Sequence, residues 1–264
     1  MSIFSNLIGA NPRTTVRHAE FVTQVEDDFG FVNSLGTGGG GSPATLAISN
    51  ACSDGAFGTA TLNTPPASGT QFGRAGLYLG RSFATQVNRD YNLGANVVNA
   101  SLDVRIKNFI THPSQAEVTC GVGWILSHNG RATSLGPSGG QAAAEHMIGF
   151  QSWGTNPNWN VSIWQETTPL VEFDTGVAKN AFNDLRCSFE IKDVSARTYR
   201  AMFWVNGRLV YTHDGFISET ASAASLVPQV EVRDKTAGTP TGSGRDSSVV
   251  VDYMTYQEQS RRYS

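Results

Sequence analysis

The stretch Phe203-Trp204-Val205-Asn206-Gly207-Arg208-Leu209-Val210-Tyr211 predicts a β-hairpin. Aromatic and aliphatic residues flank the dipeptide Asn206-Gly207 on both sides. A two-residue type I′ turn needs positive φ at both central positions, and Asn followed by Gly is the pair that adopts this conformation most readily. We therefore expect antiparallel strands on both sides of the dipeptide.

Alternation of apolar and polar residues places further strands along the chain. In Ser101–Lys107, the residues Leu102, Val104 and Ile106 share one face, and charged residues between them share the other. A second hairpin is expected over Phe150–Trp164. Similar patterns predict strands near 44–49, 56–62, 74–79, 117–127, 146–153, 160–166, 169–174, 185–193, 198–205, 208–213, 227–233 and 248–257.

These strands predict an all-β fold. Helical patterns are scarce, since only Gln141–Met147 and Glu219–Leu226 could form a turn or two. Short strands separated by turns at intervals of roughly 8–12 residues are typical of antiparallel sandwiches and barrels. Residues 1–19 show no sustained period, so we expect an irregular N-terminal arm followed by one β-sandwich domain over residues 20–264.

Composition excludes several classes of function. Charged residues make up 16% of the 264 residues and the net charge is −3, which disfavours a nucleic-acid partner. No apolar run approaches the ~18 residues of a membrane span, and the first residues lack the basic segment of a secretory signal. The three cysteines, Cys52, Cys120 and Cys187, are far apart, so we expect buried thiols rather than disulfides.

The last third of the chain carries a family resemblance. Arg186–Lys192 is followed by the hairpin Thr198–Thr212, a penultimate strand Pro228–Val232 and a closing strand Val249–Tyr256. This order resembles the C-terminal half of concanavalin-A-like jelly rolls of the laminin-G and lectin type, over about residues 185–258. The resemblance implies a concanavalin-like antiparallel β-sandwich, and it concerns fold rather than chemistry. Loops rich in Gly, Ser, Thr and Asn also resemble bacteriophage virion proteins that use such jelly rolls for capsid decoration or tail fibres.

Motifs for catalysis and metal binding are incomplete. Retaining hydrolases with a concanavalin-like fold resemble an E-x-D-x-E pattern on one strand. In Glu172-Phe-Asp174-Thr-Gly176, a glycine stands where that pattern has its third carboxylate. Gly136-Pro-Ser138-Gly-Gly140 fits the letters of a nucleophile elbow but does not follow a strand. The five histidines have no metal-ligand spacing. We therefore expect no catalytic residue, no metal and no cofactor.

One cluster suits carbohydrate binding. Trp153 and Trp159 flank a loop that contains Asn156 and Asn158. Aromatic rings pack on the apolar face of a pyranose, and neighbouring amides bond its hydroxyls. The alternative is that the tryptophans belong to the core or to a subunit contact, and the sequence leaves both interpretations open. Two other tryptophans, Trp124 and Trp204, are expected in the core.

The combined prediction is a non-enzymatic virion surface protein, either a capsid decoration or a fibre component, made in the host cytoplasm. Its expected partners are other virion proteins, further copies of itself and host glycans, with no membrane partner. Phe4, Leu7 and Ile8 in the arm are candidate apolar anchors for assembly. The alternative is that the arm folds back as an edge strand on its own sandwich. The alternatives are a glycoside hydrolase or lyase on the same fold, or a non-viral lectin.

Overall fold

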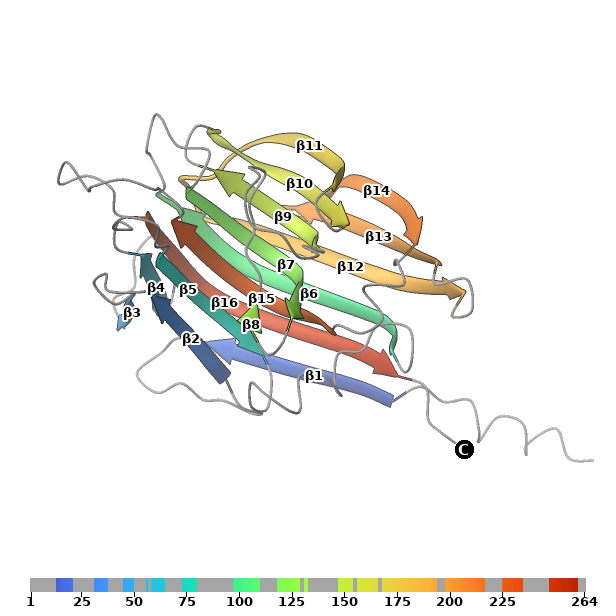
Figure 1. The fold of residues 1–264 in the computed structure, drawn as a ribbon, viewed down its shortest axis with the longest axis horizontal. Helices are drawn as coiled ribbons and strands as arrows, with labels where there is room; N and C mark the ends of the chain where they lie inside the picture. The colour runs from blue at the N-terminus through green and yellow to red at the C-terminus, as the bar shows by residue number, and fades with distance from the viewer. Residues whose placement is uncertain are drawn as a thin grey trace, which may run out of the picture.

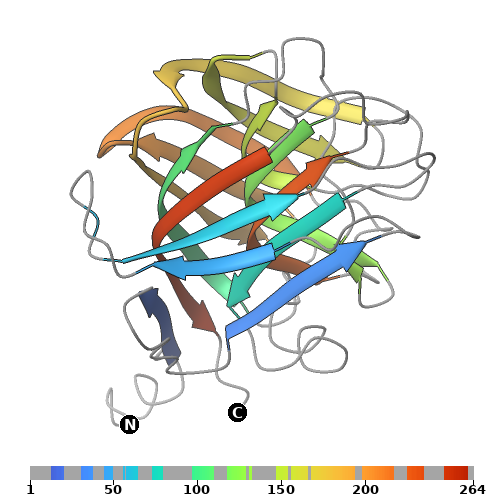
Figure 2. The ribbon, with the colours of Figure 1, turned by 90° about the vertical axis from the view of Figure 1, so that its left-hand side faces the viewer.

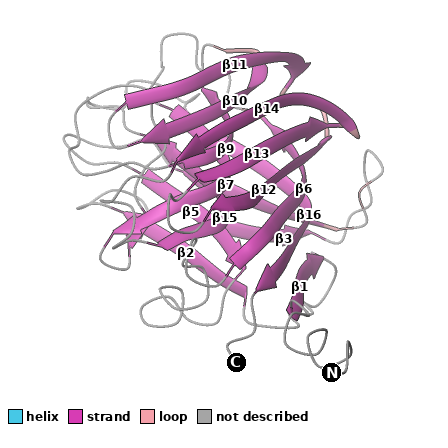
Figure 3. Cartoon of the chain, turned by 90° about the vertical axis from the view of Figure 1, so that its right-hand side faces the viewer, coloured by secondary structure: helices cyan, strands magenta, loops and turns pink. Residues whose placement is uncertain are grey.

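The computed structural model describes a two-layered antiparallel β-sandwich (Figures 1 and 2). The residues it describes are 13–20, 31–37, 45–49, 56, 58–64, 73–79, 97–109, 118–128, 131–132, 147–153, 156–165, 168–193, 198–216, 225–234 and 247–260. Within these ranges every regular element is a strand and none is a helix (Figure 3). The expected all-β sandwich is confirmed.

Sheet 1 contains both the first strand and the last strand. Its order is β14 (Arg208–Phe216), β13 (Thr198–Val205), β12 (Asn183–Asp193), β6 (Val97–Asn108), β16 (Ser247–Ser260), β4 (Thr59–Thr64) and β3 (Thr45–Ser49). The strand β1 (Arg13–Glu20) also pairs with β16. β4 pairs with Ser247–Val251 and β1 with Tyr253–Ser260, so the long closing strand joins two partners along one edge.

Sheet 2 forms the other layer. Its order is β11 (Thr168–Ala178), β10 (Asn158–Gln165), β9 (Met147–Trp153), β7 (Val118–His128), β15 (Ser225–Asp234), β5 (Gly73–Leu79) and β2 (Phe31–Thr37). The short strand β8 (Arg131–Ala132) pairs with β7. All of the pairings in both sheets are antiparallel.

The inner faces of the two sheets share one apolar core. Trp124 of sheet 2 meets Phe189 of sheet 1 edge to face, with ring centroids 4.6 Å apart, and Phe150 meets Phe203 in the same way at 5.6 Å. Such pairs add roughly 0.5–1.5 kcal/mol beyond the area that they bury. Side-chain alternation delivers these residues to the core, because every second position of each strand faces the opposite sheet.

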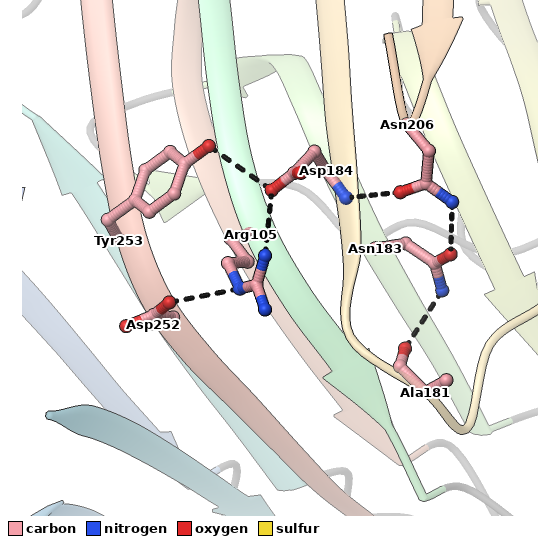
Figure 4. A network of polar contacts seen from close by, with 7 residues as sticks. All are labelled: Arg105, Ala181, Asn183, Asp184, Asn206, Asp252 and Tyr253. Carbon is pink, nitrogen blue, oxygen red and sulfur yellow. Dashed lines mark hydrogen bonds and ion pairs between the residues drawn. The ribbon is translucent and has the colours of Figure 1, made fainter. Parts of the chain in front are cut away.

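The hairpin at Asn206-Gly207 is confirmed. Asn206 has φ of 50° and Gly207 has φ of 77°, as a type I′ turn requires. The Asn206 side chain also stabilises the turn, because its Oδ1 accepts from the Asp184 N–H at 2.9 Å and its Nδ2 donates to Asn183 Oδ1 at 3.0 Å (Figure 4). The turn is thereby fastened to the neighbouring strand β12.

The predicted register of the central strands is confirmed. Leu102, Val104 and Ile106 are fully buried, whereas Asp103 and Arg105 are half-buried on the outer face of β6. Phe150–Trp164 forms the expected second hairpin, in which β9 pairs with β10. Each strand predicted from the sequence has its counterpart in one of the two sheets.

Three predictions need correction. Arg13–Glu20 is a strand on β16 rather than part of an irregular arm, because Thr14, Thr15 and Val16 supply a short β-branched run that can extend an open edge. The strand β2 includes Gly36, so the glycine-rich connection begins later than expected. Trp204, expected in the core, lies half-buried on the outer face of β13, because Phe203 and Val205 take the inward positions.

Other predictions fall outside the described residues. The proposed anchors Phe4, Leu7 and Ile8 lie there, as do the serine motif around Ser138 and most of both possible helical turns. The one residue of Gln141–Met147 that is described, Met147, begins the strand β9.

Candidate functional site

The outer face of sheet 2 carries polar side chains in register across five strands. On β10, Trp159, Val161 and Ile163 face the core, so Asn160 and Ser162 face outward. Directly opposed residues of antiparallel strands share a face. One row therefore runs from β11 to β15 through Asp174, Asn160, Gln151, Gly121 and Glu231.

A second row lies one step along the strands. It runs through Glu172, Ser162, Gly149, Gly123 and Gln229. We call the five inner polar residues of the two rows the polar strip. Its members are 0 to 3% exposed: Gln151, Asn160, Ser162, Gln229 and Glu231.

The glycines in the middle of these rows are required by close contact between backbones. A Cβ on Gly123 would lie 2.4 Å from the Ile148 carbonyl oxygen, and one on Gly149 would lie 2.2 Å from the Val122 carbonyl oxygen. Neither contact can relax by moving a flexible side chain. The strands β7 and β9 therefore leave the centre of the face without side chains, between Gln229 on one side and Ser162 on the other.

The polar strip is incompletely hydrogen-bonded. The Ser162 hydroxyl donates to Gln151 Oε1 at 3.1 Å, and the Asn160 amide donates to the Asn158 carbonyl at 3.2 Å. Within the described part of the chain, Gln151 Nε2 and both ends of the Gln229 carboxamide have no hydrogen-bond partner. A buried polar group without a partner costs about 1–3 kcal/mol. These amides are therefore arranged at the expense of stability.

The four residues predicted to bind carbohydrate lie in different environments in the structure. Trp159 is 0% exposed in the core, so it cannot stack on a sugar, and the alternative of a core residue holds for it. Trp153 is half-buried and follows the outward positions of β9. Asn156 precedes β10 and Asn158 is its first residue; both are half-buried, and Asn156 Oδ1 accepts from the Asn158 backbone N–H at 2.9 Å.

A buried lysine supports the Trp153 end of the face. Lys179 Nζ donates to the Trp153 carbonyl at 2.6 Å, and the Lys179 N–H donates to the Pro157 carbonyl at 2.9 Å. Burial lowers the pKa of Lys179 to about 8, against a smaller opposing effect of Cys120. Burial also raises the pKa of Cys120, which makes its thiol unreactive, as expected for a core cysteine.

At the opposite end of the same face lies a small apolar patch. Met147 and Trp164 pack together there, separate from the main core, and are 2% and 8% exposed. The face therefore combines carboxamides, a hydroxyl, a carboxylate and an indole.

The polar strip was not predicted from the sequence. A usable signal was the segment Pro228-Gln229-Val230-Glu231-Val232, in which polar residues alternate with core valines. It shows that a glutamine and a glutamate share one face of a strand. It does not show that Gln151 and Ser162 lie across from them, because that depends on the pairing of β15, β7, β9 and β10.

Comparison with solved structures identifies the architecture. The chain is similar to peanut lectin (TM-score 0.53, 11% identity, covering 95% of this chain and 100% of that chain). It is also similar to an endo-1,3-β-glucanase from Streptomyces sioyaensis (TM-score 0.53, 13% identity, covering 95% of this chain and 96% of that chain). A third similar structure is an endo-β-1,4-glucuronan lyase from Trichoderma reesei (TM-score 0.52, 11% identity, covering 90% of this chain and 93% of that chain). The fold is a concanavalin-like jelly roll. No protein-family model and no curated protein sequence matches the chain.

These likenesses establish the fold of the concanavalin-like domain, and its function has to be argued from its own residues. The neighbours include a lectin, a glucanase and a lyase, so one fold carries both binding and catalysis.

The carboxylates of β11 lie at the edge of the concanavalin-like sheet. Glu172 and Asp174 are exposed. Asp174 has a structural role, since its Oδ1 accepts from the Gly176 N–H at 2.8 Å and its Oδ2 accepts from Asn158 Nδ2 at 3.2 Å. Gly176 has φ of 70°, so the position where the hydrolase motif has its third carboxylate is a bend that favours glycine.

Two features are absent from the described residues. No group of three or more histidine, cysteine, aspartate or glutamate side chains is arranged there to hold a metal ion. No helix in those ranges is long and apolar enough to cross a membrane.

Proposed function

We propose that the chain is a carbohydrate-binding protein whose sugar face is the outer face of sheet 2. The observation that carries the proposal is the polar strip, in which Gln151 Nε2 on β9 and both ends of the Gln229 carboxamide on β15 are buried without a hydrogen-bond partner among the described residues. Buried polar groups without partners are rare in native proteins and call for an explanation. A saccharide supplies hydroxyls that both donate and accept, which is what these amides lack.

The rest of the face suits the same ligand. Trp164 and Met147 form a buried apolar pair at one end, and half-buried Trp153 lies toward the other. Asn156 and Asn158 lie at the accessible margin, beside exposed Asp174. Because the strip itself is buried, this margin is where a saccharide first contacts the face.

The test is glycan binding by matched variants. Gln229→Leu replaces the unpaired carboxamide with an apolar side chain of similar size, and we expect at least a tenfold loss of affinity on a glycan array. Thr212→Ala changes an exposed residue on the outer face of sheet 1 and serves as the control. Equal binding by wild type and Gln229→Leu would contradict the assignment of this face.

We also propose that the protein binds glycans without cleaving them. Two observations support this view. Asp174 and Glu231 occupy one row but are separated by four inter-strand spacings, about 19 Å. Paired catalytic carboxyl groups of glycosidases lie roughly 5–9.5 Å apart. Glu172 and Asp174 share one face of β11 at about 7 Å, so for this pair the argument rests on the bonds of Asp174. Asp174 is in addition engaged in local hydrogen bonds that shape the β11 bend.

The finer proposal is a virion surface role with self-association. Low charge density supports it, because an interface with few charges is cheaper to desolvate. Exposed apolar side chains on the two adjacent edge strands also support it, namely Leu170, Phe173, Leu209 and Phe216. Deleting residues 1–12 removes the candidate anchors Phe4, Leu7 and Ile8 but spares the paired strand β1. We expect this deletion to leave a folded protein that no longer enters particles, and normal incorporation would refute the anchor.

A further inference from the structure

The outer face of sheet 1 contains an open hollow of about 320 Å³. It lies over β13, β12, β6 and β16, on the side of the sandwich opposite the polar strip. Small-molecule sites range from about 300 to 1,000 Å³, so the hollow is large enough for a small ligand. Six of the side chains that line it are Asn99, Ser101, Ser188, Met202, Gln257 and Gln259.

The hollow follows from the lengths of side chains in three adjacent rows. Its middle row runs through Met202, Ser188, Ser101 and Gln257, so two serines occupy the centre. On β12 and β6, the rows on either side carry side chains longer than these serines. One has Arg200, Glu190, Asn99 and Gln259, and the other has Trp204, Arg186, Asp103 and Thr255. Short serines between long neighbours leave a depression with polar walls.

The charges around the hollow balance. Arg186 pairs with Asp103 at 3.7 Å and lies over the Trp204 ring at 5.2 Å, while Glu190 pairs with Lys192. The neighbouring Arg200 makes a two-pronged bond to Asp214. A site for a phosphate or a carboxylate would need an excess of positive charge, which these pairs do not leave.

The uncharged groups supply the remaining polarity. Asn99 Nδ2 donates to Gln259 Oε1 at 3.1 Å, and Gln257 is exposed beside them. Each carboxamide offers two donors and one acceptor oxygen, so three of them have far more capacity than this bond uses. The end of the same face nearer the Asn206 turn differs, because Arg105, Asp184, Asp252 and Tyr253 bond one another there (Figure 4).

We propose that this hollow is a second ligand site, which takes a neutral saccharide unit. Hydroxyls of the sugar would bond the carboxamides of Asn99, Gln257 and Gln259 and the two serines, with Met202 against its apolar face. The two outer faces of a sandwich point in opposite directions. The domain would then be divalent and able to bridge two glycan chains, which raises avidity on a dense glycan surface. The hollow on sheet 1 does not depend on the site on sheet 2, whereas divalency rests on the proposed function as well.

The test uses saturation-transfer NMR with the methyl glycosides of glucose, galactose and mannose as neutral probes. Ser188→Tyr fills the hollow, and Gln257→Leu removes an exposed carboxamide. Thr212→Tyr is the matched control, because Thr212 lies in the same row, one strand beyond Met202, and does not line the hollow. In a Gln229→Leu background, where only the hollow can bind, we expect at least a tenfold weaker signal in the first two variants and an unchanged signal in the control, with native circular dichroism throughout.

A fourth variant separates the two sites. Gln229→Leu on sheet 2 should leave the binding that Ser188→Tyr abolishes. If Gln229→Leu alone removes all binding of the neutral glycosides, the second site is refuted while the sheet 2 site stands. If Ser188→Tyr alone removes all binding, the hollow is upheld and the sheet 2 site fails. No signal with any neutral probe, or a stronger signal with methyl glucuronoside, refutes the neutral-saccharide site.

Discussion

Replacing Gln229 with leucine should make the protein more stable and less able to bind sugar. Gln229 is fully buried on the outer face of β15, and neither end of its carboxamide has a hydrogen-bond partner within the described residues. Leucine is close to glutamine in size and needs no hydrogen bond. The substitution therefore removes a desolvation penalty while keeping the packing.

The expected gain follows from the buried carboxamide. An unsatisfied buried polar group costs about 1–3 kcal/mol, so the free energy of unfolding should rise by about that amount when the whole carboxamide is removed. In chains of 150–250 residues, each kcal/mol shifts the melting temperature by roughly 2–4 °C. We expect the Gln229→Leu variant to melt about 2–12 °C above wild type.

The assay is thermal unfolding followed by circular dichroism, with Gln151→Leu as the control. The Gln151 Oε1 accepts from Ser162, so its loss leaves a buried hydroxyl unpaired and should give no stabilisation. A Gln229→Leu variant that melts below wild type would refute the reasoning, because it would show that the carboxamide is satisfied in the native protein. Equal stabilisation by both substitutions would show that the hydrogen bond to Ser162 contributes nothing.

Three further perturbations test the turn, the chemistry and the buried lysine. Gly207→Val should destabilise by about 1–3 kcal/mol in urea unfolding, through backbone strain alone, because no atom lies within 4 Å of the added Cβ. Glu172→Gln and Asp174→Asn should leave glycan binding intact, and release of reducing sugar by wild type that either variant abolishes would overturn the non-enzymatic proposal. Lys179 has a folded-state pKa of about 8 against an ordinary value of 10.5, so the unfolded chain binds more protons between these values. Relative to Lys179→Met, wild type should gain about 3 kcal/mol of stability from pH 7 to pH 10.5, and parallel pH profiles would contradict the buried position.

Local patterns predicted most of the fold. Leu102, Val104 and Ile106 alternate with charged residues, and Asn206-Gly207 allows one kind of turn, so both features could be derived from neighbours in sequence. The edge strand β1 was predicted only as an alternative and β2 was missed, because only one side of each is paired with a described strand and their sequences carry a weaker pattern. The positions of β1 and β2 depend on the unpaired edges of β16 and β5, which their own sequences do not indicate.

The site was harder to predict because it depends on register between distant strands. Trp153 and Trp159 flank one loop, yet the pairing of Gln151 with Asn160 puts Trp153 on the outer face and Trp159 in the core. A shift of one residue in this pairing would exchange the two faces. The polar strip joins β9, β10 and β15. Gln229 lies in the same row as Gly149, two strands away, and no local sequence pattern predicts this neighbourhood.

The two outer faces treat their polar groups in different ways. On sheet 1, Arg105 bonds Asp252 and Asp184, and Arg200 bonds Asp214, so the charges there are paired by residues of the same face. On sheet 2, Gln229 is buried and unpaired within the described chain, although a leucine would pack in its place. Real proteins break the rule that buried polar groups are satisfied mainly at functional or strained sites. This difference is the physical reason for proposing the principal glycan site on sheet 2.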